Sequence, residues 1–157
     1  MDALVIHTHR LAYGISDGEG SMAEPLAVAL HAVNRAGPLL GKRVLVTGCG
    51  PIGALVVIAA QALRGAFDAL RPRGVIVQLG LGGEMTLPIN TIVAKEFDLR
   101  GAFRFHAEFA TAVELINKRL VDLKPLISAT LPYRDAGRAF ALAADRSQAM
   151  KLLLSFD

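Results

Sequence analysis

The sequence predicts an α/β fold with a largely parallel sheet. Apolar runs typical of buried strands alternate with segments of helical periodicity along most of the 157 residues. The hydrophobic fraction of 53% and the mean hydropathy of +0.44 are high for a globular chain, which indicates buried parallel strands or a surface that a partner covers. A glycine-rich turn follows one apolar run directly and opens a helical pattern. These three observations favour a strand–helix alternation around one sheet.

The elements are expected in the following order. A strand-like run at 3–6 and a loop rich in Gly, Ser and Asp at 14–21 precede a helix that begins at Glu24. Pro25 suits the first turn of that helix, and Gly37-Pro38 ends it. Further strands are expected at 42–47, 74–79, 98–103, 127–131 and 151–156, and further helices at 92–97, 107–120 and 135–145.

Composition excludes several classes of protein. The longest apolar stretch, from Gly53 to Leu63, is far shorter than the ~20 residues of a membrane span. The single cysteine, Cys49, excludes an internal disulfide framework, and Met1–Leu4 shows no secretory signal pattern, so a cytoplasmic location is expected. Basic residues are scattered without interleaved aromatic residues, which predicts a solvated surface and no nucleic-acid partner, despite the net charge of +3.

The turn Gly48-Cys49-Gly50-Pro51-Ile52-Gly53 has the spacing G-x-G-x-x-G between a strand and a helix. Gly48 permits the tight turn, Gly50 lets the backbone approach a pyrophosphate, and Gly53 lets the helix pack on the strand. The N–H groups of Ile52 and Gly53 have no acceptor within the helix, so they form an anion site, and Pro51 suits the first helical turn. The alternative is a glycine-rich strand–turn–helix that binds nothing.

A dinucleotide-binding turn should be followed, about 20 residues later, by an acidic residue at the end of the next strand. Asp68 has that spacing, but it lies in an apolar stripe with helical periodicity from Leu55 to Leu70. Asp68 is therefore interpreted as a solvated helix residue. The same stripe predicts one continuous helix across Gln61–Ala66.

Several segments together resemble the medium-chain dehydrogenases of the polyol type, which include L-idonate 5-dehydrogenases and sorbitol dehydrogenases. The segments are Glu24–Val33, Arg43–Gly53, Ala66–Gly80, Lys95–Gly101 and Phe103–Phe105. The resemblance extends from about Asp17 onward, and its motifs are specific only when taken together. It implies oxidation of a secondary alcohol of a sugar acid or polyol, zinc dependence, and hydride transfer to NAD or NADP.

The resemblance also implies roles for individual residues. Glu24 matches a glutamate beside the catalytic zinc and its water, and Arg104 matches an arginine that contacts this glutamate and the substrate. Residues that match the walls around the nicotinamide are Leu79, Gly80, Leu81 and Phe103. For Glu24 an alternative stays open, because a carboxylate in the first turn of a helix is stabilised by the helix dipole alone.

Two departures from the family pattern stand out. The family's main zinc ligands, a cysteine and a His-Glu pair, belong to an N-terminal catalytic half that this sequence lacks, and catalytic zinc needs three protein ligands. His7 and His9 would share one face of a strand, but no third ligand accompanies them, so no complete metal site is expected. The nucleotide-binding half also lacks roughly sixty residues, about two strand–helix units, including the ribose-binding acid.

The sequence therefore predicts a partial Rossmann-like sheet with flanking helices and a C-terminal remnant of the catalytic domain. The expected division is 1–30 for a remnant of the N-terminal catalytic domain, 31–105 for a shortened dinucleotide-binding domain, and 106–157 for the C-terminal segment. Little turnover is expected without zinc, and the alternative is a non-catalytic nucleotide-binding or oligomerising remnant. The expected partners are a small sugar acid or polyol and a second copy of the chain.

Overall fold

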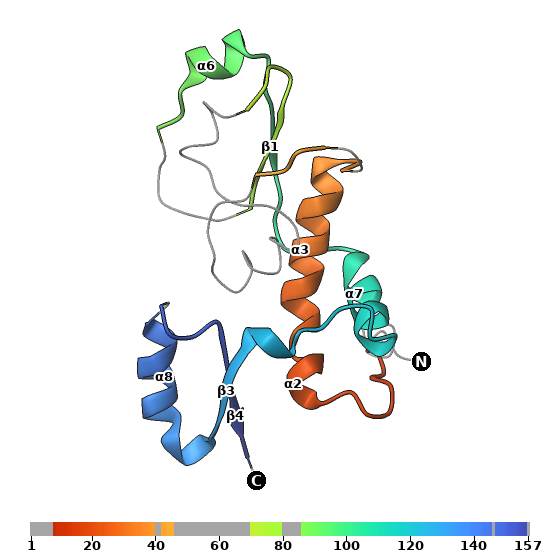
Figure 1. Cartoon of the computed structure of the whole chain (residues 1–157), viewed down its shortest axis with the longest axis vertical. Helices are drawn as coiled ribbons and strands as arrows, with labels where there is room; N and C mark the ends of the chain where they lie inside the picture. Colours follow the sequence, from red (N-terminus) through yellow and green to blue (C-terminus); the bar gives the residue numbers. More distant parts are fainter. Residues whose placement is uncertain (1–7, 40–41, 46–69, 80–85, 146, 157) are drawn as a thin grey trace. The chain divides into compact units, whose positions relative to one another are not determined.

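The computed structural model of the chain describes residues 8–39, 42–45, 70–79, 86–145 and 147–156. The chain forms two compact units, one built from Met1–Ala27 with Ala107–Asp157 and the other from Val28–His106. We call them unit 1 and unit 2 and describe each by itself (Figure 1). Within the described residues, no helix has both the length and the apolar character needed to cross a membrane. The predicted division into three functional segments stays a prediction.

Unit 1 begins with a short helix where the sequence predicted a loop. Helix α2 (Asp17–Gly20) lies inside the predicted 14–21 loop, so the loop prediction is wrong for these four residues. The cause is a capping box: the Ser16 hydroxyl accepts from the Glu19 N–H at 3.2 Å, and the Glu19 carboxylate accepts from the Ser16 N–H at 3.1 Å. These reciprocal bonds satisfy two backbone donors and stabilise a helix that composition alone disfavours.

Helix α3 (Ala23–Ala36) follows and confirms the predicted helix, with Pro25 in its first turn. It ends before Gly37, whose φ of 82° is in the left-handed region that glycine adopts at helix ends. The side chain of Glu24 lies in the first turn, on the exposed side of a helix whose other N-terminal residues are mostly buried. The boundary between the two units falls within this helix.

Unit 2 contains the first pair of parallel strands. Strand β1 (Val75–Gln78) pairs with β2 (Asp98–Gly101), and the register places Gln78 opposite Gly101. Both strands were predicted, with ends one or two residues further out. Among the described residues of this region, Ile76 and Phe97 are buried together, and the half-buried residues packed against them are Leu70, Leu87 and Ile92.

Helix α6 (Ile89–Ala94) connects β1 and β2, and it begins and ends about three residues before the predicted helix. A helix was expected at 92–97, but the chain leaves the helix after Ala94. Glu96 takes a left-handed φ of 52°, and this turn directs Phe97 into the core beside Ile76. Burial of a phenylalanine outweighs continuation of the helix at these positions.

The strand predicted at 42–47 is wrong for the residues that the structure describes there. Residues 42–45 are not part of a strand, and Val44 and Leu45 are 47% and 50% exposed. A strand needs a hydrogen-bonded neighbour, and in the described part of unit 2 strand β1 pairs with β2 alone. The rest of this strand, the turn at 48–53 and the predicted helix across 61–66 lie outside the described residues, as do Asp68 and the run at 3–6.

The C-terminal part of unit 1 follows the prediction closely. Helix α7 (Glu108–Asn117) precedes strand β3 (Ile127–Pro132), which pairs in parallel with β4 (Lys151–Ser155). Helix α8 (Ala136–Ala144) connects these strands and packs on both. Short 3₁₀ turns lie at Lys124–Leu126 and Tyr133–Asp135. Each observed element lies within about three residues of its predicted limits, and the parallel pairing confirms the predicted fold class.

The end of α7 holds the segment that leads into α2. The Asn117 side chain accepts from the Ala12 N–H at 2.7 Å and donates to the Arg10 carbonyl at 3.0 Å. Arg119 donates to the Gly14 carbonyl at 2.6 Å and lies 3.8 Å from the Glu19 carboxylate. These contacts pin an otherwise irregular segment, because the three hydrogen bonds each satisfy a backbone polar group.

Candidate functional site

The carboxyl ends of β1 and β2 define the candidate site in unit 2. Because the strands are parallel and Gln78 is opposite Gly101, the residues that follow each strand emerge at the same edge. Leu79 is half-buried directly after β1, and Phe103 is 58% exposed two residues after β2. Ligands of open parallel sheets bind at this edge. The sequence-predicted Gly80 and Leu81 continue from β1, but they lie outside the described residues.

The predicted phosphate-binding residues also lie outside the described part of the chain. They are Gly48, Gly50, Pro51, Ile52 and Gly53, and their roles stay predictions. The described residues therefore bring together two of the predicted wall residues, Leu79 and Phe103, at one sheet edge.

Arg104 adjoins Phe103 in an unusual backbone conformation. Its φ is 55°, in the left-handed region, and its guanidinium carbon lies 5.3 Å from the centre of the Phe103 ring. A left-handed conformation costs a residue with a side chain about 1 kcal/mol or more and persists where the surroundings impose it. A guanidinium that lies over an aromatic ring in a cation–π contact can still donate hydrogen bonds to an anion or a hydroxyl.

Two other left-handed arginines differ from Arg104 in their partners. Arg73 donates to the Glu96 carboxylate at 2.7 Å, and Arg119 contacts Glu19 and Gly14. Within the described residues, Arg104 forms a ring contact but no ion pair.

The segment with Phe103 and Arg104 starts at the end of β2, and contacts with the end of α3 hold β2 there. Arg35 donates from Nε to the Gly101 carbonyl at 3.0 Å, and its own carbonyl accepts from Arg100 at 2.7 Å. Arg100 also binds the Asp98 carboxylate. This hydrogen bond lowers the pKa of Asp98 and raises the pKa of Arg100, since it favours the charged form of each group.

Glu24, the other predicted catalytic residue, belongs to unit 1, whereas Arg104 belongs to unit 2. Glu24 lies exposed in the first turn of α3, so its carboxylate is near the positive end of the helix dipole. This position is compatible with both interpretations of Glu24: a residue that takes part in the reaction, and a carboxylate that only stabilises the helix.

One contact between possible ligands was not predicted from the sequence. The rings of His31, on α3, and His106, before α7, lie 5.0 Å apart between centres and 76° between planes. Their spacing along the chain matches no motif, so only the fold brings them together. His9, by contrast, is exposed, and its ring lies obliquely against Phe109 with 5.3 Å between ring centres. His7 lies outside the described residues.

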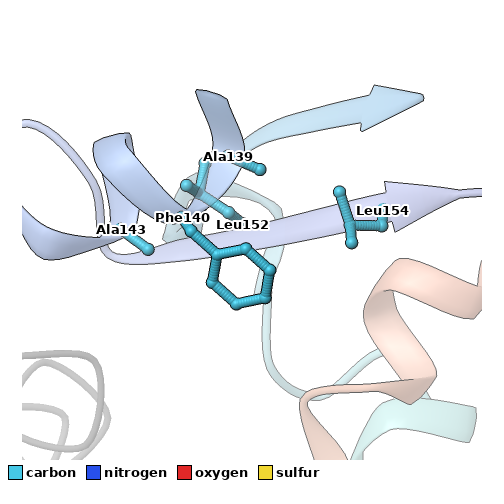
Figure 2. A pocket seen from close by; sticks show the side chains of 5 residues that line it. All are labelled: Ala139, Phe140, Ala143, Leu152 and Leu154. Carbon is cyan, nitrogen blue, oxygen red and sulfur yellow. The ribbon is translucent and has the colours of Figure 1, made fainter. Parts of the chain in front are cut away.

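The described residues contain no group of three His, Cys, Asp or Glu side chains that could hold a metal ion. They do contain a pocket of about 140 Å³ in unit 1, between α8 and β4. Figure 2 shows the Phe140 ring between Ala143 and Leu154, and the remaining lining residues are Ala139 and Leu152. All five side chains are apolar, so this pocket offers no acid, base or metal ligand for chemistry.

Comparison with known proteins gives relatives of one kind. No family profile matches the chain. The chain is 34% identical over 194 residues to the L-idonate 5-dehydrogenase (NAD(P)(+)) of Escherichia coli strain K12, covering 87% of this chain and 57% of that protein. It is 26% identical over 214 residues to the sorbitol dehydrogenase of Gallus gallus, covering 96% of this chain and 60% of that protein.

Solved structures agree with these relatives. The crystal structure of L-idonate 5-dehydrogenase from Escherichia coli K-12 matches with a TM-score of 0.83 and 32% identity, over 93% of this chain and 59% of that chain. An alcohol dehydrogenase from Escherichia coli CFT073, solved with the cofactor NADH, matches with a TM-score of 0.82 over 94% of this chain and 62% of that chain. Its identity of 20% supports the fold alone.

The alignments also measure the internal shortening. The 194 aligned positions with the L-idonate dehydrogenase use 87% of the 157 residues, or about 137, so about 57 positions face a gap in this chain. The same subtraction for the sorbitol dehydrogenase, 214 minus about 151, gives about 63. Both values agree with the roughly sixty residues expected to be absent. The homologues and structural neighbours of this chain are thus medium-chain alcohol and polyol dehydrogenases of the zinc type, and the chain spans less than two-thirds of their length.

Proposed function

We propose that the chain is an NAD(P)-dependent oxidoreductase polypeptide whose reaction is oxidation of a secondary alcohol of a sugar acid or polyol. The observation that carries this proposal is the 34% identity to an L-idonate 5-dehydrogenase over 87% of this chain. The nicotinamide, when bound, supplies the hydride acceptor. Every other part of the proposal concerns what the residues of this chain do.

The dinucleotide is assigned to the carboxyl edge of the unit 2 sheet. The G-x-G-x-x-G turn supplies its anion site through Gly48, Gly50 and Gly53, with Pro51 and Ile52 starting the helix. Leu79 and Phe103, which follow β1 and β2, are proposed to flank the nicotinamide together with Gly80 and Leu81. Apolar walls exclude water from the transferred hydride, which suppresses side reactions.

Arg104 and Glu24 are each proposed, separately, to take part in the reaction. Arg104, held over Phe103 by its left-handed backbone, presents N–H donors that suit a hydroxyl or carboxylate of the substrate. Glu24 would accept a hydrogen bond from a substrate hydroxyl and so orient the carbon that loses hydride. If Glu24 does not have this role, its carboxylate stabilises only the first turn of α3.

Zinc does not fit the described residues, because they contain no group of three ligands. We therefore derive no step through zinc. A polarising cation or a general acid supplies a large part of the stabilisation in alcohol oxidation, so the chain alone is proposed to be weakly active or inactive.

The second candidate is a non-catalytic nucleotide-binding or oligomerising protein. It is favoured by the same absence of three ligands and by the roughly sixty aligned positions that the chain lacks. In this alternative the turn at 48–53 holds a phosphate and no hydride transfer occurs.

The two candidates separate in one set of assays on the purified chain. Melting temperature is measured with and without NAD and NADP, and formation of reduced cofactor is followed with L-idonate and with sorbitol, with zinc added. Gly50→Ala should abolish any cofactor-induced rise in melting temperature, since its Cβ would obstruct approach of the pyrophosphate. Gly137→Ala is the matched control, because an added Cβ there meets no atom within 4 Å.

Reduced cofactor that forms in the wild-type chain and not in the Gly50 variant supports the oxidoreductase. A rise in melting temperature without reduced cofactor supports the nucleotide-binding alternative. If neither cofactor changes the melting temperature at millimolar concentration, the oxidoreductase and the nucleotide-binding protein are both contradicted, and the oligomerising protein is left.

A further inference from the structure

The end of strand β2 is joined to the end of helix α3 by two arginine side chains, one from each element. Arg35 of α3 donates from Nε to the Gly101 carbonyl at 3.0 Å. Arg100 of β2 donates to the Arg35 carbonyl at 2.7 Å, and the Asp98 carboxylate accepts from two further nitrogens of the same guanidinium. All four residues belong to unit 2. The two ends are therefore connected at two separate points.

The Arg35 side chain takes the place of a neighbouring strand at Gly101. The N–H of Ala102 donates to the Gln78 carbonyl of β1 at 2.9 Å. Successive residues of a strand direct their N–H and C=O groups to opposite edges, so the Gly101 carbonyl points away from β1. Within the described residues no strand pairs at that edge, and Arg35 supplies the hydrogen bond instead. The end of β2 is thus held at both edges.

The Arg100 side chain stabilises the helix end in return. The Arg35 carbonyl is among the last four of α3, which have no N–H donor within the helix. A cation at the C-terminal end of a helix is also favoured by the helix dipole. Because the Asp98 carboxylate orients the Arg100 guanidinium, this contact is formed before any ligand binds.

The contact lies immediately before the residues that leave the sheet. Ala102 is buried and completes the pairing with β1. Phe103 follows with its side chain exposed, and Arg104 then takes its left-handed φ of 55°. Side chains alternate between the two faces of a strand, so the place where β2 ends decides where the next side chains point. The hold on Gly101 therefore sets the position of the Phe103 ring.

We propose that Arg35 and Arg100 are positioning residues for the nicotinamide end of the cofactor site. This inference rests on the proposed function, because it takes Phe103 as a wall of the nicotinamide. The two arginines act through Phe103 and not by contact with the cofactor. They keep the end of β2 in place, so the ring does not have to be ordered when the cofactor binds, and binding costs less free energy.

Two kinds of ligand distinguish this role from general stabilisation of the fold. NADH carries the nicotinamide, whereas ADP-ribose has a hydroxyl in its place, and NADPH and 2′-phospho-ADP-ribose form the corresponding pair. Isothermal calorimetry on the full chain measures the Kd of each ligand. Arg35→Ala should weaken binding of the complete cofactor about fivefold, the effect of about one hydrogen bond, and change binding of the nicotinamide-free ligand less than about twofold. A residue that only stabilises the fold would change both affinities alike.

Conservative variants sharpen the test, because the two arginines donate to different numbers of groups. Arg35 makes its contact through one donor, so Arg35→Lys should keep the wild-type ratio of the Kd of ADP-ribose to the Kd of NADH. Arg100 donates to two groups at once, which lysine does not reproduce, so Arg100→Lys should lower this ratio as Arg35→Ala does. Arg71→Ala is the matched control, because it removes an exposed positive charge of unit 2 outside β2. Its ratio should equal that of the wild type.

A ratio that falls in Arg35→Ala and Arg100→Lys, and not in Arg35→Lys or Arg71→Ala, supports the positioning role. An unchanged ratio in the first two variants, or equal weakening of both ligands, would overturn that role and leave the proposed function intact. Equal binding of complete and nicotinamide-free ligands by the wild type would show that Phe103 is no wall of the nicotinamide, which also overturns it. If the wild type binds none of the four ligands, the oxidoreductase function and the positioning role are both wrong.

Discussion

Each of the two parallel strand pairs has a helix between its strands, but the two helices cover their strands to different extents. Helix α8 packs on β3 and β4, and Ala139 is buried on its inner side. Helix α6 places Ile92 on the core of unit 2 but leaves Ile89 and Val93 57% and 70% exposed. Among the described residues, the pair that carries the candidate cofactor edge is therefore the more thinly covered of the two.

This difference indicates which part of the molecule is most affected by the residues that the chain lacks. The residues expected to be absent belong to the nucleotide-binding half, and the described core beside β1 and β2 in unit 2 consists of Ile76 and Phe97 with Leu70, Leu87 and Ile92 packed against them. Exposed apolar side chains on a short sheet favour association, because each open strand edge can pair with another chain. Unit 1 keeps its complete strand–helix–strand arrangement.

The largest effect on the free energy of unfolding is expected for a substitution that disrupts the core of unit 2. Phe97→Ala should lower the free energy of unfolding by about 3 kcal/mol or more, because it removes half of the buried Ile76–Phe97 contact. Val93→Ala is the control and should change it by less than about 0.5 kcal/mol, since Val93 is 70% exposed. Urea denaturation followed by circular dichroism measures both. Equal effects would mean that unit 2 has no specific core.

The next largest effect concerns the contact between α7 and the N-terminal segment in unit 1. Asn117→Ala removes two hydrogen bonds to the backbone at Ala12 and Arg10, each worth about 1 kcal/mol. Trypsin cleavage after Arg10 should then accelerate about fivefold or more, as local opening becomes more frequent. Asn90→Ala, on exposed α6, should leave the cleavage rate unchanged. Unchanged cleavage in both variants would contradict a pinned segment.

A smaller effect is expected in the pH dependence of unit 1. Hydrogen bonds from Ser16 lower the pKa of Glu19 from its ordinary value of 4.5. A lowered carboxyl pKa adds stability that is complete above the unfolded value and is lost as pH falls through the folded value. Stability should therefore decline below about pH 4.5.

Ser16→Ala tests the cause of this decline. Without the hydroxyl and the capping box, the step in urea midpoint below pH 4.5 should become shallower. Ser21→Ala is the matched control at the other end of α2, because its hydroxyl donates to the Gly18 carbonyl and not to Glu19. A variant at Ser16 that keeps the full acid-dependent step would show that other carboxylates cause it.

The smallest effects are expected at two glycines of unit 1. Gly137→Ala in α8 should raise the free energy of unfolding by up to about 1 kcal/mol, since the added Cβ meets open space and alanine favours the helix. Gly18→Ala in α2 should give no such gain, because its Cβ would lie 3.0 Å from Leu153 and 3.3 Å from Ile127. Thermal denaturation measures both. Similar gains at the two positions would mean that α2 does not pack against the β3–β4 pair.

Prediction from the sequence succeeded where local patterns and packing agree. Gly37 and Pro25 mark the ends of α3, and alternating strand and helix patterns place β3, α8 and β4. The prediction was wrong where a contact decides the structure. The Ser16–Glu19 capping box converts a loop composition into a helix, and Val44 and Leu45 read as a strand but lie exposed and unpaired with any described strand.

The candidate site was predictable to the extent that it depends on sequence motifs. The wall residues Leu79 and Phe103 follow two strands that were predicted, so their common edge follows from parallel pairing. The strain at Arg104 and the approach of His31 to His106 depend on tertiary contacts. Neither the strain nor the histidine contact could be predicted from a residue pattern, because side chains far apart in sequence meet only after β2 is fixed against α3.

The pairing of Gln78 with Gly101 makes strand length, rather than residue identity, the most sensitive property of this edge. Successive side chains of a strand point to opposite faces, so a single residue inserted between Phe97 and Gly101 would rotate everything beyond it to the other side. Phe103 would then exchange places with its neighbour, while Leu79 stayed where it is. Lineages of this chain should therefore tolerate substitutions in β2 far more readily than single-residue insertions or deletions.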